Sequence, residues 1–107
     1  MKKNTILGII PARAGSKGIR RKNIKNIHGK PLIQWTIDEA KKVKQINKII
    51  VSTDDLKIAR LSNKLGVEIP FMRPKKYAAD NSLSLDVVLH ALSLFPDFKY
   101  ILLLQPT

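Results

Sequence analysis

The most constraining feature of this chain is a short apolar run that leads directly into a segment rich in glycine and basic residues. The run, residues 6–10, consists mainly of branched residues and ends at a proline, which is typical of a strand buried on both faces. The next segment, up to Asn23, reads P-A-R-A-G-S-K-G-I-R-R-K-N, and no acidic residue precedes Asp38. Glycines let backbone N–H groups approach an oxygen atom closely, and basic side chains neutralise its charge. The segment therefore predicts a loop that holds an anion.

This loop matches neither of two common phosphate-binding motifs. It lacks the G-K-[ST] ending of a P-loop at the required distance, and it does not follow the G-x-G-x-x-G pattern of dinucleotide sites. Two interpretations stay open. The segment is either a third kind of phosphate-binding loop or a solvated basic turn between a strand and a helix, because short glycine-basic matches often arise by chance.

Composition limits the class of protein. The length of 107 residues fits one domain, and the hydrophobic fraction of 44% is enough for a core. Cysteine is absent, which excludes disulfides and thiolate metal sites and suits a cytoplasmic protein. No apolar run approaches the roughly 18 residues that a membrane span requires, so no membrane partner is expected.

The charge balance favours an anionic partner. The chain has 20 Lys and Arg residues against 8 Asp and Glu, a formal net charge of +12. Nucleic acid is one candidate, but the six aromatic residues do not interleave with the basic ones as a stacking platform for single strands requires. No helix-turn-helix, zinc-finger or RNA-binding signature is present either. These observations argue against nucleic acid as the partner.

Strand-like apolar runs alternate along the chain with amphipathic segments. The expected strands cover residues 6–10, 48–53, 67–70 and 100–104, the last as a buried strand. The alternation predicts a Rossmann-like α/β fold with a mostly parallel sheet, flanking helices and right-handed crossovers. In such sheets ligands bind beyond the carboxyl ends of the strands, where the loops after Ile10, Pro70 and Leu104 would converge.

Three helices are expected between these strands. The first helix is expected to have Pro31 in its first turn. The second is expected to begin near Asp54 and to end at Gly66, and the third to begin at a cap formed by Ser84. Their expected apolar faces are Ile33, Ile37 and Ala40, then Ile58, Leu61 and Leu65, then Leu85, Val88, Leu89 and Leu92. Trp35 is expected to be a core or interface residue of the first helix.

Two short patterns allow both a structural and a functional interpretation. His28 precedes a glycine without a second histidine or carboxylate nearby, so a turn residue is favoured over a ligand or base. Asp54 and Asp55 follow an expected strand, where they either bind magnesium or cap the next helix, since serine, threonine and aspartate are favoured N-caps.

The glycine-basic loop resembles the N-terminal signature of the acylneuraminate cytidylyltransferases, enzymes that make CMP-activated nonulosonic (sialic-type) acids. Five further matches follow in the order of the family: H-G-K-P-L-I at 28–33, I-I-V-S-T-D-D at 49–55, R-P at 73–74, A-A-D at 78–80 and L-L-L-Q-P-T at 102–107. They cover nearly all of this chain, whereas the pattern of the family continues past Q-P-T. The resemblance implies that residues 1–107 are the N-terminal nucleotide-binding part of a single nucleotidyltransferase-type domain, incomplete at its C-terminus.

The reaction that the resemblance implies joins CTP to a nine-carbon 2-keto sugar acid and releases pyrophosphate. The anomeric hydroxyl attacks the α-phosphorus, and Mg²⁺ neutralises the departing pyrophosphate. Such catalysis depends mostly on positioning and charge stabilisation. The resemblance also implies that the magnesium ligands lie beyond this chain, with none at Asp54 or Asp55, that the full-length family member is a homodimer, and that this chain alone has no measurable transferase activity.

The resemblance assigns roles to individual positions. Arg13 and Lys22 would hold the triphosphate and act in catalysis, and Gln105 would reach toward the sugar acid. The other implied nucleotide contacts are Pro11, Ala12, Gly15, Ser16, Lys17, Asn23, Arg73, Ser82 and Ser84, with Leu83 standing where small residues are common in the family. The competing interpretations are surface cations for Arg13, Lys22 and Arg73, a turn or cap residue for Asn23, and an edge-strand polar residue for Gln105.

Other functions stay open beside this one. The sugar acid is alternatively the eight-carbon 2-keto acid of lipopolysaccharide cores, or a legionaminic or pseudaminic acid, although K-G-I-R-R-K-N looks more like the nonulosonate branch. A different class of function is a truncated, non-catalytic module that binds nucleotides or nucleic acid. A salt titration distinguishes a nucleic-acid-binding module from a CTP-binding enzyme. Binding of a charged polymer weakens steeply with salt because many counterions are released, whereas binding of one triphosphate should be saturable and selective for the base.

Overall fold

The computed structural model describes residues 6–12, 25–69, 72 and 84–105. Its elements are β1 (Ile6–Pro11), β2 (Asn26–Ile27), β3 (Lys30–Pro31), α1 (Leu32–Lys41), β4 (Lys48–Ser52), α2 (Leu56–Lys64), α3 (Ser84–Leu94) and β5 (Tyr100–Leu103). The predicted order of elements is kept except that no strand lies between α2 and α3 in the described residues, and a small β2–β3 hairpin is added before α1. None of the helices in the described part is both long and apolar enough to cross a bilayer.

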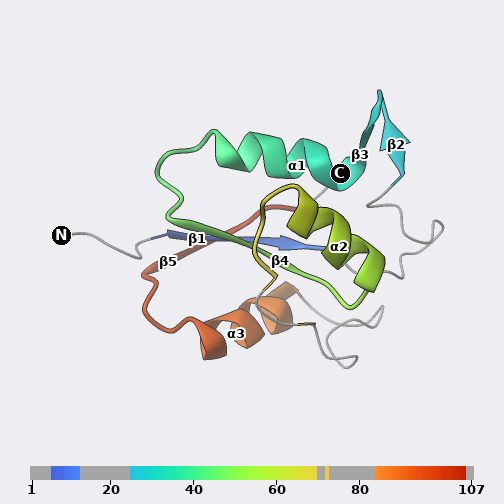
Figure 1. The fold of residues 1–107 in the computed structure, drawn as a ribbon. Coiled ribbons are helices and arrows are strands. Elements are labelled where there is room, and N and C mark those ends of the chain that lie inside the picture. Colours follow the sequence, from blue (N-terminus) through green and yellow to red (C-terminus); the bar gives the residue numbers. More distant parts are fainter. Residues whose placement is uncertain (1–5, 13–24, 70–71, 73–83, 106–107) are drawn as a thin grey trace.

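A three-stranded parallel sheet forms the centre of the fold, with β1 between β4 and β5. Ile9, for example, pairs with Ile50 on one side and with Leu103 on the other. Figure 1 shows α1 and α3 on opposite sides of the sheet, and Ile58 of α2 packs in the same cluster as Ile33 and Ile37 of α1. The predicted parallel α/β architecture is confirmed.

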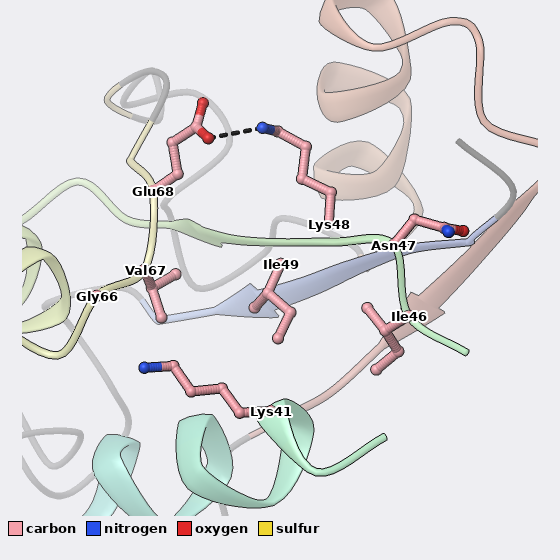
Figure 2. A pocket seen from close by; sticks show the side chains of 8 residues that line it. All are labelled: Lys41, Ile46, Asn47, Lys48, Ile49, Gly66, Val67 and Glu68. Atoms are coloured by element: carbon pink, nitrogen blue, oxygen red, sulfur yellow. Dashed lines mark hydrogen bonds and ion pairs between the residues drawn. The ribbon is translucent and has the colours of Figure 1, made fainter. Parts of the chain in front are cut away.

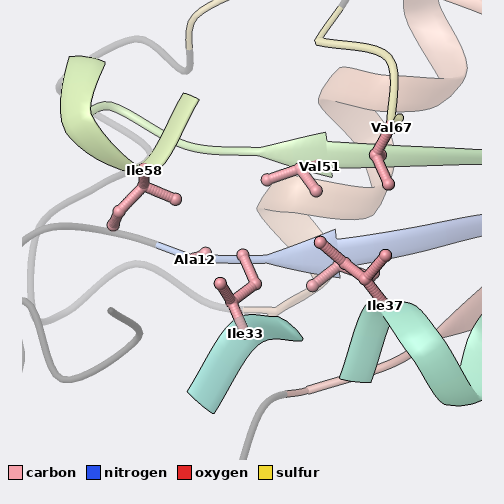
Figure 3. Close-up of a cluster of buried hydrophobic side chains, with 7 residues drawn as sticks. Ala12, Ile33, Ile37, Val51, Ile58 and Val67 are labelled. Atoms are coloured by element: carbon pink, nitrogen blue, oxygen red, sulfur yellow. The ribbon is translucent and has the colours of Figure 1, made fainter. Parts of the chain in front are cut away.

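Two hydrophobic clusters lie on opposite faces of the sheet, because successive side chains of a strand point to opposite sides. The cluster under α1 and α2 consists of Ile10, Ala12, Ile33, Ile37, Val51, Ile58 and Val67 (Figure 3). The cluster under α3 consists of Leu7, Ile9, Ile50, Val87 and Ala91. β1 contributes to both clusters, which confirms that it is buried on both faces. The predicted buried face of α1, Ile33, Ile37 and Ala40, is confirmed as well.

The prediction for the buried face of α3 is wrong. Leu89 is 54% exposed, whereas Val87 and Ala91 are buried against the sheet. Val88 and Leu92 are half-buried, and the side chain of Leu85 lies outside the described part. The segment S-L-D-V-V-L-H-A-L-S-L has apolar residues on nearly every side, so periodicity alone does not fix which of them face the sheet.

The predicted strand at 67–70 is reduced to a single parallel bridge between Ile50 and Glu68. The N–H of Val51 donates to the Glu68 carbonyl at 3.3 Å, and no longer ladder forms in the described residues. This stretch is therefore a contact beside β4 rather than a strand.

Two further predictions need correction, one for β5 and one for Pro31. The prediction that β5 is buried is wrong, because β5 pairs with β1 alone among the described strands, and Tyr100 and Leu102 are 62% and 40% exposed. Pro31 does not lie in the first turn of α1 but is its N-cap, with φ −57° and ψ 145°. Pairing of Pro31 with Asn26 in the hairpin requires an extended backbone at the proline, so the helix begins one residue later.

Candidate functional site

The carboxyl end of β1 is fixed by backbone contacts on both of its sides. Pro11 ends the strand, and Ala12, which is buried, donates its N–H to the Ser52 carbonyl of β4 at 2.9 Å. On the other side, the N–H of Leu104 donates to the Ile9 carbonyl at 2.8 Å. Pro11 and Ala12 thus lie where the carboxyl ends of the parallel strands meet, which is the predicted location of the ligand site. The predicted anion-binding loop begins directly after this fixed point.

The chain is also attached to the fold where it leaves that loop. Lys25 is the first described residue after it, and its carbonyl accepts the N–H of Leu32, the first residue of α1, at 2.9 Å. Between them lies the β2–β3 hairpin, whose turn residues His28 and Gly29 have φ angles of +49° and +86°. Positive φ at both turn positions is typical of a two-residue type I′ hairpin turn, which confirms the turn predicted at His28.

Asp55 caps α2. Its Oδ1 accepts the N–H of Lys57 at 3.0 Å, and its own N–H donates to Oγ1 of Thr53 at 3.1 Å. Thr53 and Asp55 are both buried. The capping interpretation is confirmed for Asp55, and the described residues contain no group of three or more His, Asp or Glu that could hold a metal ion.

Removal of this cap provides a test of its role. Asp55→Ala is expected to lower the free energy of unfolding by about 1 kcal/mol, because the start of α2 loses the side-chain acceptor of its Lys57 N–H. Asp55→Asn should restore most of this loss, since the amide oxygen accepts the same hydrogen bond. Urea unfolding in EDTA measures both. A variant Asp55→Ala that is as stable as the parent in EDTA would contradict the capping role.

A groove of about 540 Å³ lies between α1 and β5, and it includes the predicted substrate residue Gln105. Its lining residues are Leu32, Trp35, Thr36, Glu39, Ala40, Val43, Leu103, Leu104 and Gln105. Gln105 is exposed and lies just past the carboxyl end of the edge strand. Both the predicted contact and the edge-strand interpretation agree with this position.

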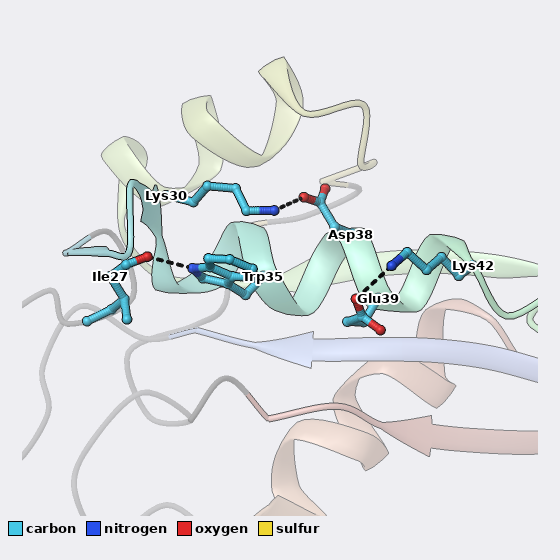
Figure 4. A network of polar contacts seen from close by, with 6 residues as sticks. All are labelled: Ile27, Lys30, Trp35, Asp38, Glu39 and Lys42. Carbon is cyan, nitrogen blue, oxygen red and sulfur yellow. Dashed lines mark hydrogen bonds and ion pairs between the residues drawn. The ribbon is translucent and has the colours of Figure 1, made fainter.

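Trp35 and Lys30 form a contact that the sequence did not indicate. The Trp35 Nε1–H donates to the Ile27 carbonyl at 2.8 Å, and Lys30 Nζ lies 4.0 Å from the centroid of the Trp35 ring (Figure 4). Lys30 also pairs with Asp38 at 2.7 Å. Trp35 is 37% exposed, so of the two predicted roles, core or interface residue, the core role is wrong. Lys30 and Asp38 belong to different elements, so no helical spacing could have indicated the pair.

The second ion pair of α1 lies away from the hairpin. Lys42 Nζ contacts the Glu39 carboxylate at 2.9 Å, and both side chains are largely exposed. This hydrogen bond, followed by the charge of Glu39, raises the pKa of Lys42 above its ordinary value. Since lysine is already protonated at neutral pH, the shift does not change its charge there.

A smaller cavity of about 250 Å³ lies at the amino end of β4, opposite the carboxyl ends of the strands (Figure 2). Lys48 pairs across it with Glu68 at 2.6 Å, and the Lys41 ammonium donates to the Leu65 carbonyl at the end of α2. These lysines connect neighbouring elements of the fold. The carboxyl edge, where the predicted loop begins, is therefore the better candidate for the site.

Comparison with known proteins identifies the family. A sequence model of the family described as cytidylyltransferase matches residues 7–105. The chain belongs to the cytidylyltransferase family. Cytidylyltransferases are enzymes that transfer a nucleotidyl group, and the match runs from the second residue of β1 to beyond β5.

Relatives within the cytidylyltransferases carry names for different sugar acids. The N-acylneuraminate cytidylyltransferase of Escherichia coli O18:K1:H7 is 39% identical over 95% of this chain and 24% of its own length. The CMP-N,N'-diacetyllegionaminic acid synthase of Legionella pneumophila is 41% identical over 95% of this chain and 46% of its own length. This chain therefore spans less than half the length of either relative.

A solved structure supports the fold. A CMP:2-keto-3-deoxy-manno-octonic acid synthetase, solved in complex with CTP, superposes with a TM-score of 0.81 at 24% identity, over 95% of this chain and 40% of that one. At this identity the likeness shows the α/β fold of the cytidylyltransferases and no more.

The described residues contain only part of the predicted site. Pro11, Ala12 and Gln105 lie at carboxyl ends of neighbouring strands, and Ser84 is the first residue of α3. The predicted positions outside the described residues are Arg13, Gly15, Ser16, Lys17, Lys22, Asn23, Arg73 and Ser82. Their roles in this cytidylyltransferase-family chain stay predictions.

Proposed function

We propose that this chain supplies the CTP-binding part of an enzyme that activates a nonulosonic acid as its CMP-sugar. One observation supports the proposal most strongly. In a chain of the cytidylyltransferase family, the predicted loop starts at the carboxyl edge of the sheet, at Ala12, and returns to the fold at Lys25, against α1. The loop is thus attached at the edge where parallel α/β sheets bind their ligands.

The proposed mechanism assigns charge stabilisation to the basic residues of the loop. The anomeric hydroxyl of the sugar acid releases its proton to water as its oxygen bonds to the α-phosphorus of CTP. The bond from that phosphorus to the bridging oxygen of the β-phosphate breaks, and pyrophosphate leaves. Arg13 and Lys22 would neutralise the triphosphate as negative charge moves to the leaving group. Lys17 and the backbone at Gly15 and Ser16 would donate further hydrogen bonds.

The remaining proposed contacts complete the nucleotide and acid sites. Asn23, Arg73, Ser82 and Ser84 would border the nucleotide, and Gln105 would contact the sugar acid at the groove beside α1. Among the described residues, the Asp55 carboxylate caps α2, and no three or more His, Asp or Glu side chains gather where they could hold a metal ion. No step of the proposed reaction is therefore assigned to a metal on this chain.

The choice of a nonulosonic acid as substrate is more specific than what the names of the relatives support. The names of the relatives include a neuraminic and a legionaminic acid, and the solved structure is that of an octonic acid synthetase. We favour the nonulosonates because K-G-I-R-R-K-N at residues 17–23 resembles that branch. The choice among these acids leaves the CTP half of the proposed reaction unchanged.

Calorimetric titration with CTP and ATP in magnesium tests the proposed function. CTP is expected to bind saturably and ATP more weakly, and Arg13→Ala should weaken CTP binding about 30-fold, because a charge-assisted contact to phosphate is lost. Arg60→Ala is the matched control, since Arg60 is exposed on α2 and its loss changes the net charge equally. The control should bind CTP within about twofold of the parent.

Two results of this titration would contradict the proposal. One is the absence of CTP binding by the parent chain. The other is equal binding of CTP and ATP that Arg13→Ala and Arg60→Ala weaken to the same extent. If the second result came with a steep salt dependence and tighter binding of an oligonucleotide, a nucleic-acid-binding module would be the better interpretation.

A further inference from the structure

The two edges of the three-stranded sheet differ in how they are covered. At the β4 edge, Ile50 bridges to Glu68, and Lys48 pairs with Glu68 at 2.6 Å. At the other edge, β5 pairs with β1 alone among the described strands. Its sequence, Y-I-L-L, contains no charged residue and no proline, which are the residues that commonly protect an edge strand from further pairing. The β5 edge is therefore able to accept another strand.

The backbone of β5 presents hydrogen-bonding groups at this edge. The N–H of Leu104 donates to the Ile9 carbonyl at 2.8 Å, so the polar backbone groups of residue 104 face β1. In a parallel sheet these groups point alternately to one neighbouring strand and to the other. The N–H and C=O groups of Ile101 and Leu103 therefore point away from β1, to the side where no described strand lies.

The side chains of β5 also leave apolar surface at this edge. Ile101 and Leu103 pack against the cluster under α3. Successive side chains of a strand point to opposite faces, so those of Tyr100 and Leu102 point to the α1 side of the sheet. Both are exposed there, although they belong to an apolar strand.

The groove between α1 and β5 continues this apolar surface. Trp35 on α1 and Val43 just after it line the groove, and they are 37% and 40% exposed. Among the described lining residues only Glu39 carries a charge, and it already pairs with Lys42. Apolar side chains beside backbone groups that face no described strand fit a partner that adds a strand of its own.

Charge and length indicate the source of that strand. No lysine or arginine is among the described residues that line the groove, so the groove offers no cation to an anionic ligand. The net charge of +12 opposes the association of two copies of the chain. The relatives, however, contain polypeptide with no counterpart here, because the chain covers 46% of the Legionella pneumophila synthase and 40% of the solved octonic acid synthetase.

We propose that the β5 edge and the α1–β5 groove form the interface at which the further polypeptide of a cytidylyltransferase of that length docks, by adding a strand beside β5. The added strand bonds to the backbone of Ile101 and Leu103, and its side chains cover Tyr100, Leu102 and the groove. Gln105 lies past the end of β5, so it stays at the carboxyl edge of the sheet. This inference rests on the family and the fold, and not on the choice of the sugar acid.

The experiment compares the chain alone with a chimera in which it replaces the matching part of the Legionella pneumophila synthase. Amide exchange of Ile101 and Leu103 is measured in both proteins. These amides are expected to exchange about 100-fold more slowly in the chimera, because the added strand accepts their hydrogen bonds. The Leu104 N–H is the internal control, since its bond to the Ile9 carbonyl does not depend on the added strand.

A pair of lysine substitutions tests the apolar part of the interface. Leu102→Lys should lower the melting temperature of the chimera by about 8 °C, because a charge is then buried against the added strand. In the chain alone Leu102 is exposed, so the same change should cost no more than about 3 °C. Leu89→Lys is the matched control, because Leu89 is an exposed leucine on α3. It should shift either melting temperature by no more than about 3 °C.

Three outcomes would overturn the inference. One is exchange of Ile101 and Leu103 that is as fast in the chimera as in the chain alone. Another is slow exchange of both amides in the chain alone together with sedimentation as a dimer, because a second copy would then cover the edge. The third is an equal loss of stability of the chimera from Leu102→Lys and Leu89→Lys. If the chimera does not fold, exchange at the aligned positions of the Legionella pneumophila synthase itself decides the question, and fast exchange there would count against the inference.

Discussion

Ile37→Ala is expected to lower the free energy of unfolding by about 3 kcal/mol, the usual size for removing a buried isoleucine side chain. Ile37 is fully buried on α1, in the cluster that also contains Val51 of β4 and Val67. The truncation leaves a cavity between α1 and the sheet that the surrounding backbone can fill only in part. A domain of this size has about 5–15 kcal/mol of stability in total, so the loss is large. Urea unfolding followed by circular dichroism measures it.

The matched control is Leu89→Ala on α3. It removes a side chain of similar size, but Leu89 is 54% exposed, so the expected change is within about 0.5 kcal/mol. Equal losses in the two variants would contradict the burial of α1 or the observed face of α3.

Gly8→Val is expected to destabilise the chain by about 2–3 kcal/mol through overpacking at the centre of the sheet. Gly8 pairs with Ile49 of β4 and Leu102 of β5. A Cβ at this position would lie 3.2 Å from Cγ2 of Ile46 and 3.6 Å from Cδ1 of Leu104. One methyl group needs only a small shift of Ile46, whereas the two further methyl groups of valine would press against these side chains.

Gly8→Ala separates this steric effect from a general effect of losing a glycine. It should cost clearly less than valine, because its single added carbon has only one contact shorter than 3.6 Å, the one with Cγ2 of Ile46. Thermal unfolding of the two variants compares them. A valine variant as stable as the alanine variant would show that the space beside β1 is larger than observed.

The arrangement of the sheet could be predicted because apolar residues recur at regular spacing in its strands and in α1. The branched run at 6–10 and the spacing of Ile33, Ile37 and Ala40 each have a single interpretation. Asp55 could be predicted as a cap, since a short acceptor before an amphipathic segment is the common signal for a helix start. These features depend on neighbouring residues in the sequence, which is why the sequence reveals them.

The features that could not be predicted depend on contacts between distant residues. The buried face of α3 is set by which residues fit against Leu7 and Ile9, and its sequence is apolar on too many sides to show this. The contacts of Trp35 with Ile27 and of Lys30 with Asp38 likewise join a hairpin to a helix, so neither element indicates them alone. For the site, the position of Ala12 followed from the strand, whereas the roles of Arg13 and Lys22 came from family resemblance.

The central position of the first strand has a consequence for how the protein is made. β1 leaves the ribosome before any of its partners, but Ile6 pairs with Tyr100, and Leu7 pairs with Lys48 and Ile101. Both sides of β1 therefore stay without backbone partners until much later parts of the chain have been synthesised. Pairing between distant segments is slow because a long loop must first close. During synthesis the apolar strand β1 therefore stays unpaired until β4 and β5 have been made. We expect the nascent chain to depend on chaperones at this stage.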